Sequence, residues 1–184
     1  YPSLVPDDIH AAIKYSEAAL KDGIGEVTYT ANFYAHSNES PDKVTWQLLK
    51  THLQNTAELA RRHAAEFGMQ DIGYVMGLLH DAGKYAWRFQ QKLLGKKESV
   101  DHSSAGAKIA NDKYKAIGKL MAYGICGHHG GLPDGIDAGF GGERSSLSKR
   151  LDKATDDIFA FFSEIHLPEE MQFHYNPKGI KKGI

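Results

Sequence analysis

The chain has 184 residues, which is enough for one well-packed domain and short for two. Its formal net charge of −1 excludes a globally basic nucleic-acid-binding protein, so any nucleic acid would have to bind a local patch. The single cysteine excludes a disulfide framework, and no stretch resembles a transmembrane span or a signal peptide, so we expect a cytoplasmic protein that does not bind membranes.

Helical periodicity dominates the first half of the chain. Helix-start residues and apolar spacing predict helices over 6–21, from Ser40-Pro41 to Phe67, and over 71–79. Residues 27–34 alternate enough to predict a short strand or an extended segment.

The second half continues in the same manner. Helices are predicted over 87–94, 104–110, 117–126 and 147–162, with a glycine-rich loop over 130–142. There is no internal repeat and no second composition regime, so we expect residues 1–184 to form a single all-α domain with a minor strand near the N-terminus. Because the chain starts at Tyr1 rather than methionine, we also expect it to be a fragment of a longer protein.

The pair His80-Asp81 interrupts an otherwise apolar helix end. Adjacent helical positions point about 100° apart, so one helix end cannot bury both side chains without partners. A buried carboxylate is costly unless it is paired or bound to metal. Gly77 would let another helix approach closely. On these residues alone, a salt bridge from Asp81 to Lys84 is as good an interpretation as metal binding.

Further histidines favour the metal. His128 and His129 lie side by side at a predicted helix end, followed by two glycines, and His102 lies at a helix start. His52 flanks an apolar stripe, a position where a histidine taken alone is more often a hydrogen-bonded core residue. Imidazole is the commonest ligand for transition metals, and a carboxylate can bridge two of them. Two metals about 4 Å apart suit in-line displacement at phosphorus.

This set of residues resembles the HD superfamily of metal-dependent phosphohydrolases, which are helical bundles. Within it, the sequence is most similar to the HD nuclease domain of the type I CRISPR-associated helicase–nuclease, and in particular to the type I-C branch. The resemblance covers about residues 32–150 and rests on five motifs in order, namely FYAHS (33–37), HLQNTAELA (52–60), GLLHDAGKYAWRFQ (77–90), DHSSAGA (101–107) and GHHGGLPDG (127–135).

The resemblance implies a role for each matched position. His52, His80 and Asp81 would bind a first metal, and Asp81 would bridge to a second. The ligands of the second metal would be His102, His128 and His129. Lys84 would contact the scissile phosphate, and water activated by metal would be the nucleophile. Sequence does not choose among manganese, iron, nickel and cobalt, and magnesium is also compatible. His36 in the first motif is expected to make a structural hydrogen bond.

A nuclease also needs a surface for the strand. Four cations near the central motif, Arg88, Lys92, Lys96 and Lys97, are candidates for contacts with single-stranded DNA. The neighbouring aromatic residues are better interpreted as core. The partners implied are an RNA-guided CRISPR surveillance complex and a helicase domain, in the same chain or another, because no G-x-x-x-x-G-K-[ST] loop is present.

One family feature has no clear counterpart. The family pattern ends with a late aspartate in the first metal's shell, whereas Asp152, Asp156 and Asp157 resemble a solvated helix face. Three functions therefore stay open. The first is a metal-dependent nuclease that cleaves single-stranded DNA in type I CRISPR interference. The second is an HD phosphohydrolase acting on nucleotides or cyclic nucleotides, which would need a closed pocket. The third is a catalytically weak binding module.

Overall fold

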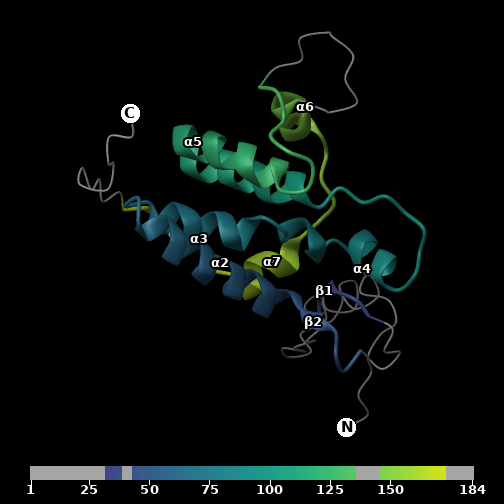
Figure 1. Ribbon diagram of the computed structural model, residues 1–184. Coiled ribbons are helices and arrows are strands. Elements are labelled where there is room, and N and C mark those ends of the chain that lie inside the picture. Colours follow the sequence, from purple (N-terminus) through teal and green to yellow (C-terminus); the bar gives the residue numbers. More distant parts are fainter. Residues whose placement is uncertain (1–31, 39–42, 136–145, 173–184) are drawn as a thin grey trace, which may run out of the picture. The chain divides into compact units, whose positions relative to one another are not determined.

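The computed structural model describes residues 32–38, 43–135 and 146–172 (Figure 1). The chain forms two compact units, Tyr1–Phe33 and Tyr34–Ile184, and the first lies almost wholly outside the described residues. The helix predicted over 6–21, most of the strand predicted over 27–34, and the glycine-rich loop beyond residue 135 also lie outside them. The description below concerns the second unit.

The second unit is a helical bundle with a two-stranded sheet, which confirms the predicted all-α fold with a minor strand. Its elements in chain order are β1 (Tyr34–His36), β2 (Gln47–Leu48), α2 (Leu49–Ala65), α3 (Gln70–Leu79), the 3-10 helix η1 (Ala82–Tyr85), α4 (Trp87–Leu93), α5 (Ser103–Gly127), α6 (Leu147–Asp152) and α7 (Phe159–Glu164). None of the helices within the described ranges is long and apolar enough to cross a membrane.

Helices α2 and α3 pack directly against each other. The apolar stripe of α2 is fully buried, with Leu49, Leu53 and Ala57 all inaccessible to solvent. At Gly77 of α3, an added Cβ atom would lie 2.4 Å from the Cα atom of Ala57. No larger residue fits there, so the close helix approach predicted from this glycine is confirmed.

Helix α5 is a hairpin rather than a rod. Lys115 has non-helical dihedral angles, with φ 54° and ψ −126°, and divides the element into two arms that lie side by side (Figure 1). A straight helix of 25 residues would be about 37 Å long. Instead, His102 and His129 at its two ends meet, with 2.8 Å between their Nε2 atoms. The two helices predicted over 104–110 and 117–126 correspond to the two arms.

The helix predicted from Ser40-Pro41 to Phe67 begins later than expected, at Leu49. Lys43 adopts a positive φ of 59°, and Gln47 and Leu48 pair with β1 as an antiparallel strand. The ring of Trp46 packs edge-on against Tyr34, with 5.4 Å between centroids. This cross-strand contact outweighs the helical pattern at the start of the predicted helix.

The helix predicted over 147–162 was also wrong, because two short helices, α6 and α7, occupy that stretch. The backbone becomes extended at Lys153, where ψ is 137°. At the start of α7, the Asp157 carboxylate accepts a hydrogen bond of 2.9 Å from the Phe159 backbone N–H. A short polar side chain that binds the backbone competes with helix continuation. Asp156 and Asp157 therefore lie in the connecting segment rather than on a helix face.

Candidate metal centre

Asp81 lies at the point where α3 gives way to η1. The helix ends with His80 as its C-terminal cap, and the carboxylate that follows turns inward, leaving Asp81 only 3% exposed. Five histidines on or next to three helices surround it. His52 lies on α2, His80 follows α3, and His102, His128 and His129 lie at the two ends of α5. The structure thus brings together all six predicted ligands.

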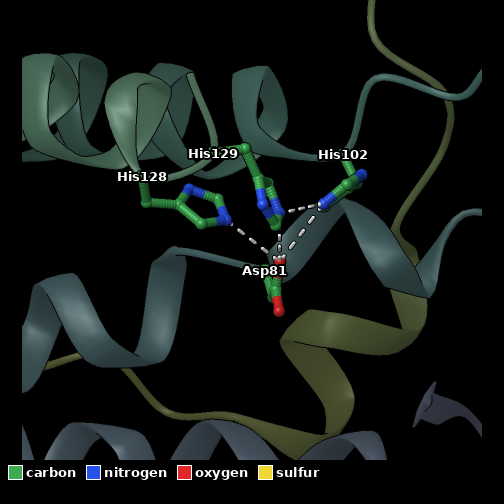
Figure 2. Close-up of side chains that lie close together, drawn as sticks. All are labelled: Asp81, His102, His128 and His129. Carbon is green, nitrogen blue, oxygen red and sulfur yellow. Dashed lines mark hydrogen bonds and ion pairs between the residues drawn. The ribbon is translucent and has the colours of Figure 1, made fainter. Parts of the chain in front are cut away.

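Three imidazoles face one oxygen of this carboxylate (Figure 2). The Nε2 atoms lie 3.5 Å from Asp81 Oδ1 for His102, 3.4 Å for His128 and 4.0 Å for His129. These distances are long for hydrogen bonds, and Oδ1 is buried without a hydrogen-bond partner in the part of the chain that the structure describes. A buried carboxylate oxygen without a partner is costly, so this position favours a cation.

The other carboxylate oxygen has three nitrogen neighbours. The Nε2 atoms of His52 and His80 each lie 3.1 Å from Asp81 Oδ2. The Lys84 ammonium lies 2.9 Å from the same oxygen. The salt bridge from Asp81 to Lys84, which the sequence left open, is therefore present on this side of the carboxylate.

Backbone carbonyls fix the tautomer of three of the imidazoles. The Nδ1 atom lies 2.7 Å from Gly77 O in His80, 3.2 Å from Val100 O in His102 and 2.7 Å from Ile125 O in His128. Because a carbonyl only accepts, each Nδ1 donates a proton to it, which leaves Nε2 as the ring nitrogen that faces Asp81 and could bind a metal. Such outer contacts orient histidine ligands in metal sites.

Burial of Asp81 and the side chains around it shift its pKa in opposite directions. Burial alone would raise the pKa of this carboxyl group, but the facing imidazoles of His128, His52 and His80 hold its pKa far below the ordinary range. Burial lowers the pKa of His102 and of His129, which favours the neutral ligand form of both rings. For His128, burial also acts downward, but Asp81 and the Ile125 carbonyl outweigh it and raise the pKa.

The donor set fits divalent metal. Lone pairs of neutral imidazoles repel a carboxylate unless a proton or a metal ion lies between them. The group of Asp81, His102, His128 and His129 and the group of His52, His80 and Asp81 each place one ligand atom per residue within 4.8 Å of the others. The first group is the better fit, since its carboxylate oxygen has no other partner, whereas Lys84 already neutralises the oxygen of the second group.

Lys84 is anchored as well as charged. Its side chain is buried, and its ammonium donates to the Ala35 carbonyl of β1 at 3.1 Å besides pairing with Asp81. The lysine therefore ties the metal centre to the small sheet. Its contact with a scissile phosphate stays a prediction.

The four cations predicted to bind DNA lie on α4 and the segment after it. Arg88 is engaged by two carboxylates, those of Glu98 and, at 3.6 Å, Asp156. Lys92 lies over the buried ring of Phe89, with 5.7 Å to its centroid, which confirms the core interpretation of that aromatic residue. Lys96 and Lys97 are exposed. Their DNA contacts stay predictions.

The late aspartate has no counterpart in the described residues. Within these ranges, neither ligand group includes Asp152, Asp156 or Asp157. Asp156 pairs with Arg88, and Asp157 accepts a hydrogen bond from the backbone N–H of Phe159 at the start of α7.

Two placements beside the centre could not be predicted from the local sequence pattern. Gln90 is buried and binds the backbone of β1 through both ends of its amide, accepting from Tyr34 N at 3.1 Å and donating to Tyr34 O at 3.0 Å. His36, expected to be structural, lies edge-on to the ligand His52, with 5.1 Å between ring centroids. Both depend on how β1 docks on the bundle, and the local sequence does not encode that docking.

Metal affinity is expected to fall as the pH drops from about 8 to about 6, by up to about tenfold per pH unit for each proton displaced. The reason is that metal competes with protons for Nε2, and the raised pKa of His128 keeps its proton bound at higher pH than in a free histidine. Equilibrium dialysis of Mn²⁺ against the metal-free protein at three pH values measures this. Affinity that stays constant over this interval would exclude His128 as a ligand.

A family model for the HD domain matches residues 49–160, which is more than half of the chain. A search of curated proteins finds no match. All six residues of the centre fall within the matched segment, and β1 lies outside it. HD domains are metal-dependent phosphohydrolases, and the histidine–aspartate centre agrees with that chemistry.

Proposed function

Because the chain belongs to the HD domain family, we propose that it is a metal-dependent nuclease that cleaves single-stranded DNA by phosphodiester hydrolysis in type I CRISPR interference. The observation that carries the metal-dependent chemistry is the orphaned Oδ1 of Asp81, buried and faced by three imidazole nitrogens. The finer assignment to DNA rests on the five ordered sequence motifs.

The six residues of the centre would act as metal ligands in two groups. Asp81, His102, His128 and His129 would hold one ion, and His52 and His80 with Asp81 would hold a second. Manganese, iron, nickel or cobalt suits these nitrogen-rich groups best, and magnesium is a weaker alternative. When bound, such ions activate water and neutralise charge on the phosphate. The backbone carbonyls at Nδ1 keep the rings in the orientation that this requires.

Lys84 would exchange Asp81 for the phosphodiester when metal is bound. In the present arrangement its ammonium neutralises Asp81 Oδ2. With metal held at that oxygen by His52 and His80, the Lys84 ammonium would be available to the phosphodiester as a point cation, while its hydrogen bond to the Ala35 carbonyl could remain. The group with His52 and His80 is therefore expected to bind metal with lower affinity than the group with His102, His128 and His129.

The alternatives fit the described residues less well. A nucleotide phosphohydrolase would need a closed pocket beside the metals, and neither of two cavities among the described residues, of about 640 and 360 Å³, is lined by any of the six ligands. A weak binding module would account for the lack of a late aspartate. In the nuclease proposal the protein acts in the cytoplasm, with an RNA-guided surveillance complex and a helicase domain, in cis or in trans, delivering the single-stranded DNA.

The test is cleavage of circular single-stranded DNA by protein loaded with Mn²⁺ or Ni²⁺, with nucleotide hydrolysis measured in parallel. We expect linear and then shorter products from the circle, because an endonuclease needs no free end. Hydrolysis of nucleotides with an intact circle would contradict the nuclease and support the second function. Incomplete metal occupancy without either activity would support the binding module.

A further inference from the structure

The ligand imidazoles leave one face of the metal centre open to solvent. Their side chains are partly exposed, from 15% for His102 to 22% for His128, and that of His129 is 60% exposed. Asp81 below them is closed off, with its side chain 4% exposed. Among the described residues, the exposed edges of these rings are where a phosphodiester could reach the centre.

His36 lies beside one of these rings. It is exposed, and its ring stands edge-on to His52 at 5.1 Å and an interplanar angle of 87°. The same centroid distance separates His52 from its fellow ligand His80. His36 nevertheless belongs to neither ligand group. It is beside the metal positions without being among their ligands.

Buried side chains set the position of this histidine. Gln90 holds both the N–H and the carbonyl of Tyr34, and Lys84 donates to the carbonyl of Ala35. Both of these side chains are buried, at 5% and 4% exposure. Beyond His36, the Asn38 amide donates to Thr45 Oγ1 at 2.7 Å. Since successive residues of a strand point to opposite faces, Ala35 turns into the core and His36 turns outward.

We propose that His36 is a substrate-contacting residue, which donates an imidazole N–H to an oxygen of the phosphodiester bound at the metal centre. The inference deepens the proposed function and rests on its phosphodiester chemistry. Lys84 serves here as a positioning residue, because its ammonium donates to the Ala35 carbonyl of the strand that carries His36. The histidine would thus be held beside the metal centre.

The competing roles of His36 are separable by substitution. His36→Ala removes the ring, His36→Phe keeps a ring that can pack edge-on to His52 but has no N–H, and His36→Asn keeps a shorter donor. His63→Ala is the matched control, since His63 is an exposed histidine on the same helix as His52, eleven positions further along. The probe is inorganic phosphate, whose binding to Mn²⁺-loaded protein is measured by paramagnetic relaxation of its ³¹P signal.

We expect His36→Ala and His36→Phe to weaken phosphate binding by roughly three- to tenfold, as loss of one hydrogen bond predicts. His36→Asn should recover part of the affinity, and His63→Ala should match the wild type. Mn²⁺ content should be unchanged in all four variants. The same ranking is expected in KM for DNA cleavage, with a smaller change in kcat.

Three results would overturn the inference. Wild-type affinity in His36→Phe would mean that the ring only packs on His52. A loss of Mn²⁺ in His36→Ala would make His36 a ligand. A loaded wild-type protein that binds no phosphate would remove the contact altogether. Failure of the nuclease proposal is distinct from these, since a protein that binds phosphate through His36 but leaves the DNA circle intact contradicts only that proposal.

Discussion

Asp81→Asn is expected to lower kcat for phosphodiester cleavage by at least about a thousandfold and to remove most of the bound metal. The carboxylate is shared, since Oδ1 faces three imidazoles and Oδ2 faces two. Its loss therefore affects both ligand groups at once. Metal content by mass spectrometry, measured beside initial rates, tests both expectations.

The substitution also leaves Lys84 buried without its anionic partner, which costs several kcal/mol of folding stability. His129→Ala separates metal loss from unfolding, because this side chain is 60% exposed and its removal should leave the fold intact. Asp152→Asn is the control for carboxylate removal, as Asp152 is exposed and belongs to neither group. Retention of full activity by Asp81→Asn would disprove a metal centre built on this residue.

Gly83→Ala is expected to lower the free energy of unfolding by at least about 2–3 kcal/mol. An added Cβ atom would lie 2.3 Å from the carbonyl oxygen of His102, a backbone atom that cannot turn aside as a side chain can. The Gly83 N–H also donates to that oxygen at 3.1 Å. Any relief of the clash moves η1, and Asp81 with it, away from the start of α5.

Chemical denaturation of the metal-free protein measures this loss, and metal titration of the folded fraction measures the accompanying fall in affinity. Gly130→Ala is the matched control for stability, since no atom lies within 4 Å of the Cβ position there. Equal stability of the two variants would show that η1 and α5 do not meet as described. A stable Gly83→Ala variant with unchanged metal affinity would contradict the same contact.

The sequence predicted the parts of the fold that depend on local pattern. Apolar spacing located α2, α3 and α4, and Gly77 correctly indicated close helix packing. The late start of α2 and the break between α6 and α7 were missed. Both follow from contacts with specific partners, namely the ring of Tyr34 for Trp46 and the Phe159 backbone N–H for the Asp157 carboxylate. Periodicity carries no information about these contacts.

The metal centre was more predictable than the fold around it. Clustered histidines beside an aspartate at a helix end indicated a metal site, and the resemblance to the HD superfamily then implied the six ligands. The anchoring of Lys84 and Gln90 on β1 was not predictable, because long flexible side chains reach whatever the tertiary structure brings near. The place of His36 beside His52 follows from that anchoring.

The central claim is that Asp81 is the shared carboxylate of a metal centre. Anomalous diffraction at the manganese absorption edge, from crystals grown with Mn²⁺, tests it most directly. We expect a peak within coordination distance of Asp81 Oδ1 and the Nε2 atoms of His102, His128 and His129, with any second, weaker peak at Oδ2 near His52 and His80. Crystals that bind Mn²⁺ elsewhere, or that show no peak at Asp81, would contradict the claim.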